Sequence, residues 1–362
     1  GYSITTGTKN VLMGHLTGDN MTTGSDSTFI GYEAGGAITT GTSNTIIGAA
    51  AGDALTDADE NVAVGKDALG SDTLGSKSTA IGHQTLANQN LTTATETFNT
   101  AVGHFAGNAV TTGTNNTLIG GLAGDSTTTG KVNTFIGTTC GEACTIGVQN
   151  TGVGGGEIGA SPAALNGLTE GDNNSALGHS AGSSITTGSN NLMLGHDSGI
   201  TGSPGGNITT ASNTIVLGDE NISACHIQTD WTVASDQRDK TEFTALDLGL
   251  DFVKGLEPVT YKWDKRSKYV DKNDVDLDLI VHDGTHKEDW LDVGFKAQEV
   301  EALEAAAGYV ISEKTNLTTN LSEDGKQMGL QYSKFVPILV KAMQEQNVLI
   351  EALTARVEEL EG

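Results

Sequence analysis

Residues 44–52 read Asn-Thr-Ile-Ile-Gly-Ala-Ala-Ala-Gly, and variants of this stretch recur from the start of the chain to Gly218. In each copy an apolar residue precedes a Gly, and the residue four positions before that Gly is usually Asn or Ser. The period between successive repeat Gly positions is 17 in eight of eleven steps, and 21, 24 or 23 in the other three. They are Gly14, Gly31, Gly48, Gly65, Gly82, Gly103, Gly120, Gly137, Gly154, Gly178, Gly195 and Gly218. A fixed period of this kind is the signature of a repeat architecture.

Each repeat unit is predicted to hold two short β-segments joined by two tight turns. Gly supplies the turn conformations with positive φ, and Asn and Thr satisfy backbone groups in the turns. One unit has too few apolar residues for a core of its own, whereas stacked units share a continuous core. The repeats therefore predict a mainly β rod of about twelve units, either a β-solenoid or a β-roll shared between chains. The thin core favours three chains side by side.

The charge of the chain excludes several classes of function. The net charge is −26 over 362 residues. Residues 1–230 hold 19 acidic residues and 4 lysines, which gives −15, and the remainder holds 26 acidic and 15 basic residues, which gives −11. Such a surface cannot neutralise phosphates, so we expect neither a nucleic-acid partner nor binding to anionic lipid. No run of 18 apolar residues is present, so no membrane insertion is expected.

Three cysteines, Cys140, Cys144 and Cys225, are spread over the chain. An odd number excludes a complete intrachain disulfide framework, and no second pair or nearby His completes a zinc set. We therefore expect reduced thiols, no metal, no cofactor and assembly in a cytoplasm. The sequence starts at Gly1 without a signal-like segment, so it is expected to be a fragment or a processed product.

The repeats end near residue 222, and the chain beyond has an ordinary composition that includes all three tryptophans. Residues 243–263 are predicted to form a helix, a turn and a strand, and residues 294–307 a strand and a helix. The highly charged residues 265–292 are expected to form a loop or an inserted hairpin, and residues 308–333 a hairpin with polar loops. A second, small α+β domain is therefore expected.

The end of the chain carries a heptad pattern over residues 336–361. Apolar residues fill the a positions, and the d positions are apolar except for one Gln, a polar layer of the kind that selects register. The a positions are Val336, Met343, Ile350 and Val357, and the d positions are Leu339, Gln346, Leu353 and Leu360. The pattern predicts a coiled coil that joins copies of the chain, although a lone amphipathic helix on a globular domain shares it.

The second domain contains three short segments whose order along the chain is informative. Residues 234–240 read Ala-Ser-Asp-Gln-Arg-Asp-Lys, residues 294–300 read Gly-Phe-Lys-Ala-Gln-Glu-Val, and residues 332–342 read Tyr-Ser-Lys-Phe-Val-Pro-Ile-Leu-Val-Lys-Ala. Together they resemble the endosialidase-type intramolecular chaperone, a self-cleaving C-terminal peptidase domain of phage tail spikes and fibres. The repeats resemble those of phage tail fibres and of trimeric autotransporter adhesin heads, which share Asn-Thr-x-Ile-Gly with a following Ala-Gly.

These resemblances imply a division of the chain into a fibre shaft (residues 1–222), a linker to a cleavage site (223–234) and a chaperone domain (235–362) that ends in a trimeric coiled coil (336–361). They imply a homotrimer whose chaperone templates folding of the β-shaft. The implied setting is a virion tail fibre that is assembled in the host cytoplasm. Its implied partners are other phage tail proteins and a glycan or protein of the host surface.

The resemblance also implies that the chaperone cuts the chain between Ala234 and Ser235, as a serine peptidase of a single turnover. Ser235 would be the nucleophile and Lys240 its general base, because burial lowers the pKa of a Lys enough for the neutral amine to accept a proton. Asp236 and Arg238 are expected to support the pair. Asp236 and Asp239 would oppose the neutral amine unless they are held away or used to position Lys240, and Arg238 would disfavour the ammonium or stabilise oxyanion charge.

Other functions stay open at this point. The main alternative is a bacterial trimeric surface adhesin with a retained trimerisation domain that does not cleave. A glycan hydrolase needs paired carboxylates in a groove, and the acids of the repeats are scattered. An ice-binding array needs Thr pairs on every coil, which several units lack. Five histidines directly follow a repeat Gly and either hold a metal in a trimer or occupy a variable exposed position: His15, His83, His104, His179 and His196.

Overall fold

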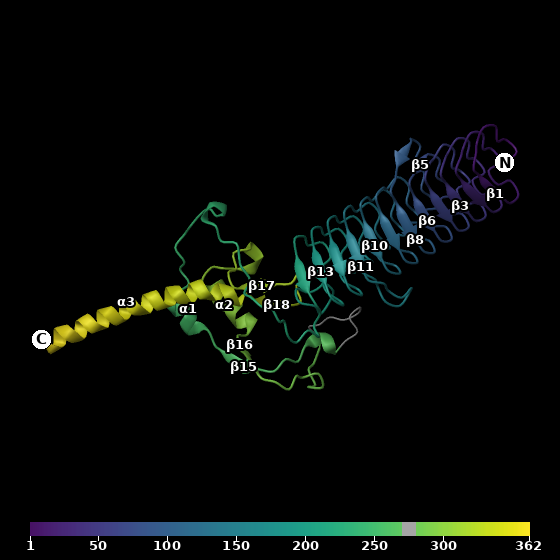
Figure 1. Ribbon diagram of the computed structural model, residues 1–362. Helices are drawn as coiled ribbons and strands as arrows, with labels where there is room; N and C mark the ends of the chain where they lie inside the picture. The colour runs from purple at the N-terminus through teal and green to yellow at the C-terminus, as the bar shows by residue number, and fades with distance from the viewer. Residues whose placement is uncertain (270–279) are drawn as a thin grey trace. The chain divides into compact units, whose positions relative to one another are not determined.

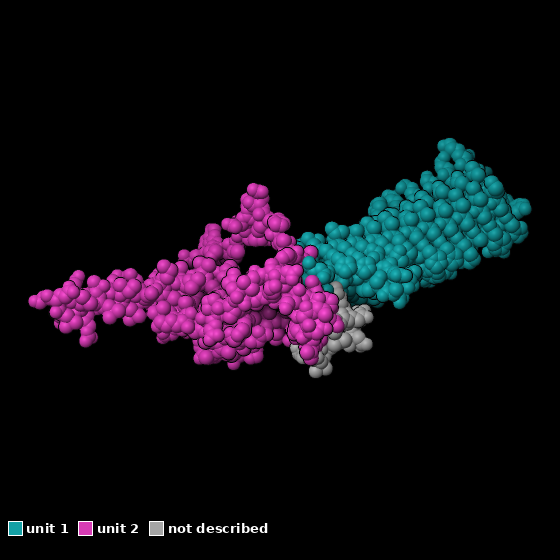
Figure 2. Space-filling model, turned by 90° about the horizontal axis from the view of Figure 1, so that it is seen from below, with its two compact units in different colours: residues 1–221 teal, residues 222–362 magenta. Residues whose placement is uncertain are grey.

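The repeat units form a parallel β-solenoid in the computed structural model, which describes residues 1–269 and 280–362. The chain divides into two compact units, Gly1–Asn221 and Ile222–Gly362 (Figure 2). The first unit is the solenoid, and the second is a small α+β unit that ends in a long helix (Figure 1). The predicted fold class, a mainly β repeat followed by a small α+β domain, is confirmed.

Each turn of the solenoid contributes one three-residue strand to a twelve-stranded sheet that runs along one side of it (Figure 1). Neighbouring strands pair in parallel and in register, so that Thr28, Thr45 and Val62 lie in one row. In sheet order the strands are β1 (Val11–Met13), β2 (Thr28–Ile30), β3 (Thr45–Ile47), β4 (Val62–Val64), β6 (Thr79–Ile81), β8 (Thr100–Val102), β9 (Thr117–Ile119), β10 (Thr134–Ile136), β11 (Thr151–Val153), β12 (Ser175–Leu177), β13 (Leu192–Leu194) and β14 (Ile215–Leu217). The repeat period of the sequence is therefore one turn of a solenoid within one chain.

The core of the solenoid is one side chain deep at each strand. Side chains alternate along a strand, so the middle residue points inward and its two neighbours point outward. The inward row includes Phe29, Ile46 and Phe135, which are fully buried together with small residues such as Ala51. The apolar residue directly before each repeat Gly points outward instead and stays at least partly exposed, as Ile119 does.

A ladder of buried Asn side chains explains the polar residue at the start of each repeat. The Oδ1 atom of Asn116 accepts a hydrogen bond from the Asn133 backbone N–H of the next turn at 3.0 Å. Its Nδ2 atom donates to the Gly130 carbonyl oxygen at 2.9 Å. Because buried backbone groups must find partners, each Asn satisfies two backbone groups that the short strands leave unpaired.

The prediction of two β-segments in every unit is wrong. Besides the long sheet, the described solenoid has one further strand pair, β5 (Gly75–Ser76) with β7 (Thr95–Glu96). Elsewhere the Thr-Thr-Gly corners stack as turns: the Thr22 N–H donates to the Thr39 carbonyl oxygen at 2.8 Å, and the Thr111 N–H to the Thr128 carbonyl oxygen at 2.9 Å. Hydrogen bonds between successive corners satisfy the backbone without a second strand.

The repeat Gly is required by the close approach of successive turns. Gly48 has φ +139°, a conformation that residues with a side chain rarely adopt. A Cβ atom at this position would lie 2.4 Å from the carbonyl oxygen of Gly65 in the next turn. The same relation recurs along the solenoid, so the Gly period sets the spacing of the turns.

The second unit has the elements that its sequence predicts. The helices are α1 (Leu250–Gly255), α2 (Ala297–Ala306) and α3 (Phe335–Glu361), with short 3₁₀ turns η1 (Gln237–Asp239), η2 (Arg266–Lys268), η4 (Ile311–Glu313) and η5 (Tyr332–Lys334). The strands are β15 (Val259–Tyr261) with β16 (Asp292–Gly294), and β17 (Thr319–Leu321) with β18 (Met328–Leu330), both pairs antiparallel. Part of the predicted charged loop, residues 270–279, lies outside the described residues. Among the described helices none has the length and hydropathy of a membrane span.

Candidate active site

The segment that carries the predicted cleavage site is exposed. Every residue from 221 to 240 is exposed, and among them the structure assigns only the short turn η1 as helix. Asp236 caps that turn, because its Oδ1 atom accepts a hydrogen bond from the Arg238 N–H at 2.9 Å. The bond between Ala234 and Ser235 thus lies in extended, accessible chain directly before a single tight turn.

The turn brings Ser235 and Lys240 together. The Lys240 ammonium nitrogen, Nζ, donates a hydrogen bond to the Ser235 hydroxyl oxygen, Oγ, over 2.6 Å. This distance lies within the range in which a base can take a proton from a nucleophile. Both side chains are exposed within the single chain.

Asp236 and Arg238 pair with each other beside this contact. An Arg238 guanidinium nitrogen, Nη2, lies 2.6 Å from Asp236 Oδ2, and Nε lies 3.0 Å from Oδ1. The guanidinium hydrogen bonds and the Arg238 backbone N–H lower the pKa of Asp236. The carboxylate charge that would stabilise a Lys240 ammonium is therefore largely matched by the neighbouring guanidinium.

The other two segments singled out in the sequence meet in the core of the second unit. The ring of Phe295 stacks on that of Phe335 with centroids 5.4 Å apart, and the Phe295 N–H donates to the Tyr332 hydroxyl at 3.2 Å. A Cβ atom on Gly294 would lie 2.4 Å from the Tyr332 hydroxyl oxygen. Val300, at the end of the same segment, is buried in this core. These segments therefore build a scaffold rather than supply reacting groups.

Two acidic residues that the sequence analysis missed hold this scaffold together. Glu345 on α3 accepts a hydrogen bond from the backbone N–H of Leu250 at 2.7 Å, and so fastens the start of α1 to the long helix. Glu304 on α2 is buried and accepts hydrogen bonds from the backbone and hydroxyl groups of Thr318 and Thr319. Burial raises the pKa of Glu304, but these hydrogen bonds outweigh burial and lower it overall. Glu304 lies one helical turn after Val300, on the buried face of α2, and that spacing was an available signal.

Helix α3 uses one face inside its own unit and leaves another exposed. Phe335, Ile338 and Ala342 are buried against the rest of the unit. The predicted heptad residues lie elsewhere on the helix, and all eight are exposed in the single chain: Val336, Leu339, Met343, Gln346, Ile350, Leu353, Val357 and Leu360. The exposed apolar stripe is therefore available to other chains.

Comparison with known proteins identifies the second unit. Residues 235–309 match the family described as chaperone of endosialidase. The chain carries an endosialidase chaperone domain. The match begins at Ser235, and no curated protein or solved structure matches the chain. A β-solenoid followed by this chaperone domain is typical of phage tail fibres, and the domain implies a phage tail fibre-type protein with an intramolecular chaperone.

The chaperone family implies two general properties. Membership implies a self-cleaving peptidase, and endosialidase chaperone domains act in trimers. The predicted chaperone family, with its typical occurrence in phage tail fibres, is thereby confirmed. The reacting residues, the cleaved bond and the heptad contacts stay predictions.

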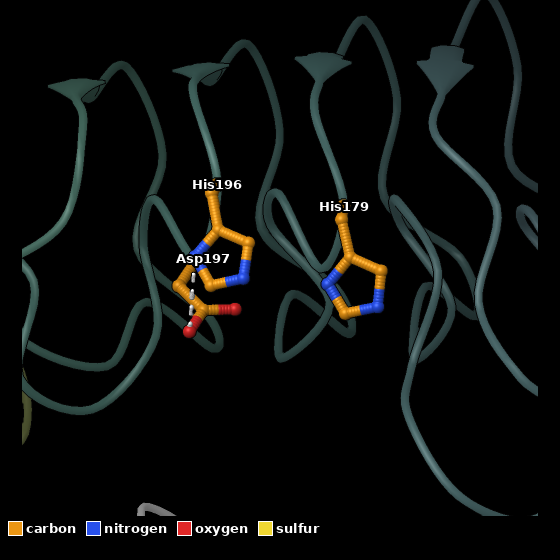
Figure 3. A group of neighbouring side chains, drawn as sticks. All are labelled: His179, His196 and Asp197. Carbon is orange, nitrogen blue, oxygen red and sulfur yellow. Dashed lines mark ion pairs between the residues drawn. The ribbon is translucent and has the colours of Figure 1, made fainter.

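Outside the chaperone domain, one group of three potential metal ligands comes together in the described residues: His179, His196 and Asp197 (Figure 3). The two imidazole rings stack at 5.4 Å because they occupy the same position in successive turns. Both ring nitrogens of His179 already contact hydroxyls, those of Ser161 at 3.1 Å and Ser180 at 2.9 Å. The repeat itself therefore accounts for the cluster, and we assign no metal to it.

The cysteines do not form a reactive site in the solenoid. Cys140 and Cys144 are fully buried in its core, and burial raises the pKa of each thiol to about 12. A thiol with so high a pKa is neither a nucleophile nor a ready metal ligand at neutral pH. Cys225, in the exposed segment at the start of the second unit, is a free, exposed thiol.

Proposed function

We propose that this chain is a host-attachment fibre of a phage tail, whose C-terminal chaperone trimerises, templates folding of the β-solenoid and then cleaves the chain between Ala234 and Ser235. The observation that carries the cleavage proposal is the hydrogen bond between Lys240 Nζ and Ser235 Oγ, 2.6 Å long, at the first residue of the family match. Exposure of the surrounding segment supports it, since a bond to be cut must be accessible.

The proposed reaction uses the chain's own groups and one water molecule. Ser235 Oγ attacks the carbonyl carbon of Ala234, and the neutral Lys240 amine takes the hydroxyl proton. The bond between that carbon and the Ser235 nitrogen breaks, the nitrogen receives the proton, and the Ala234 acyl group remains as an ester on Oγ. Water then hydrolyses the ester with Lys240 again as base. The products are a carboxylate at Ala234 and a free amino group at Ser235.

In this proposal, trimer formation regulates cleavage. Lys240 must be neutral to act as a base, and an exposed Lys is charged at neutral pH. Burial of the segment by neighbouring chains would lower its pKa, because a low dielectric disfavours the ammonium. In the Asp236–Arg238 pair the guanidinium matches the charge of the Asp236 carboxylate. Cleavage would then follow assembly and release a fibre that has already folded.

The heptad residues of α3 are the proposed trimer contact. Their exposure in the single chain leaves an apolar stripe that a coiled coil buries in its a and d positions. Other tail proteins and a glycan or protein of the host surface are the proposed partners of the finished fibre in the virion, with assembly in the host cytoplasm.

A set of four variants tests the proposal, with cleavage followed on denaturing gels and chain number measured by light scattering. Ser235→Ala and Lys240→Met should stay uncut but trimeric, whereas Lys254→Met, a matched exposed lysine in the same unit, should be cut like the wild type. Ile350→Asp should abolish both trimer and cleavage. Normal cutting of Lys240→Met would remove Lys240 from the mechanism, and cutting of a monomeric Ile350→Asp chain would refute the coupling to assembly.

A further inference from the structure

The outward face of the long solenoid sheet has an unusual composition. Each of the twelve strands turns its first and third residues outward, which gives two rows of side chains. One row holds Val11, Thr28, Thr45, Val62, Thr79, Thr100, Thr117, Thr134, Thr151, Ser175, Leu192 and Ile215, and the other holds Met13, Ile30, Ile47, Val64, Ile81, Val102, Ile119, Ile136, Val153, Leu177, Leu194 and Leu217. We call these two rows together the sheet face. Every residue of the second row is Ile, Val, Leu or Met.

The sheet face is free of charge in a strongly acidic shaft. Residues 1–230 contain 19 acidic residues and 4 lysines, and none of them belongs to the sheet face. Copies of so acidic a shaft repel one another wherever their carboxylates meet. Contact through the sheet face joins surfaces to which no charged side chain belongs.

The sheet face is exposed and long. The side chains of its apolar row are partly or fully exposed in the single chain, and Met13 is 60% and Leu177 55% exposed. Eleven steps of about 4.8 Å and a strand length of about 10 Å give a footprint of about 500 Å². The wholly apolar row makes up about half of this footprint, and contiguous apolar patches of a few hundred Å² commonly mark interaction sites.

We propose that the sheet face is the surface through which the shafts of the trimer contact one another, each shaft turning this face toward the other two copies. The inference rests on the proposed trimer and names the shaft surface that it uses. A footprint of about 500 Å² is small for chains that meet freely, since stable interfaces bury about 800 Å² on each partner. Before cleavage, the trimeric chaperone domains hold the three shafts at one end and supply the missing association, because tethered copies face each other at millimolar effective concentration.

The composition of the sheet face does not suit a small polar ligand. It offers Thr and Ser hydroxyls but no aromatic ring, carboxylate or amide. Binding sites for small molecules bring a few different polar groups together in a concave pocket. Two uninterrupted rows that repeat from turn to turn instead match a partner with the same repeat, which is another copy of this shaft.

Disulfide cross-linking tests the proposal in the full chain. The background variant combines Ser235→Ala, which keeps the chaperone attached, with Cys225→Ser, which removes the exposed thiol, while Cys140 and Cys144 stay buried. Into it we would place Ile119→Cys on the sheet face and, as a control, Thr112→Cys at an exposed turn of the solenoid outside the sheet. Ile136→Cys, one strand further along, gives a second test position if Ile119→Cys folds poorly.

After mild oxidation, non-reducing gels should show covalent pairs of chains for the sheet-face cysteines and none for Thr112→Cys. Three thiols around one axis form only one disulfide, so up to two thirds of the chains should become linked. A trimer by light scattering without links at the sheet face, or with links only at Thr112→Cys, would overturn the assignment. A monomer by light scattering would overturn it together with the proposed trimer, so the two failures are distinguishable.

Discussion

Removal of one side chain from the Asn ladder should open the solenoid locally. Asn116 is fully buried. Its side chain accepts a hydrogen bond from the Asn133 N–H and donates one to the Gly130 carbonyl oxygen, both in the next turn. Asn116→Ala removes both partners and leaves two backbone groups unsatisfied. Asn116→Ser should be milder, because Ser27 in the equivalent position of another turn accepts a hydrogen bond from the Asn44 N–H at 3.2 Å.

The size of the effect follows from the two lost hydrogen bonds. An unsatisfied buried backbone group costs about 1–3 kcal/mol, so two such groups cost about 2–6 kcal/mol before neighbours relax. A value of about 3 kcal/mol corresponds to roughly a 100-fold change in a local opening equilibrium, at about 1.4 kcal/mol for each factor of ten. Asn116→Ser keeps an acceptor and loses only the donor, so about half of this free energy should return.

Amide hydrogen exchange measures this opening directly. The exchange rate of peptides that cover residues 128–136 should rise roughly 100-fold in Asn116→Ala, at about 1.4 kcal/mol for each factor of ten. Thr112→Ala, at an exposed turn of the same coil, is the control and should exchange like the wild type. Equal exchange in Asn116→Ala and the control would refute the view that the Asn ladder holds the turns together.

Three further predictions test the glycines, the buried carboxylate and the thiols. Gly48→Ala forces a Cβ atom to 2.4 Å from a carbonyl oxygen, so thermal unfolding should show a loss of about 2 kcal/mol or more, whereas Gly121→Ala, whose nearest neighbour would lie at 3.9 Å, should be almost neutral. Glu304→Gln should cost about 2 kcal/mol at pH 7. Folding lowers the pKa of Glu304, so the carboxylate stabilises the fold fully above its unfolded pKa of about 4.3, and this stabilisation is lost as the pH falls through the folded pKa. If the urea midpoints of the wild type and Glu304→Gln differed by the same amount at pH 7 and at pH 3, this account would be contradicted. Under native conditions a thiol reagent should modify Cys225 alone, and more than one modified thiol per chain would contradict the burial of the other two.

The sequence predicted the solenoid well because its signal is periodic. The repeat Gly and Asn fall at fixed positions, and every one of the twelve strands ends one residue before a repeat Gly. The second β-segment was predicted wrongly, because the backbone outside the single strand of each turn finds its hydrogen bonds between stacked turns and needs no second strand. Residues such as Ile119 pack outward although they are apolar, and only the strand register reveals which of two adjacent apolar residues faces the core.

The candidate active site was partly visible in the sequence because it is local. Ser235 and Lys240 lie close together in the sequence, so one turn is enough to bring them into contact. The contacts made by Glu345 and Glu304 were missed because their partners lie far away in sequence or in a separate hairpin. The pairing of Asp236 with Arg238 was also missed, since either could have turned toward Lys240, and only the capped turn decides between these partners.

The denatured intact mass of the purified chain, measured beside Ser235→Ala, tests the central claim most directly. The wild type should give two fragments, residues 1–234 and 235–362, and the variant should give one chain of 37.2 kDa. Fragments split at another bond would contradict the assignment of Ala234 and Ser235. A single uncut mass in both would contradict self-cleavage and leave a fibre that keeps its chaperone, as the adhesin alternative requires.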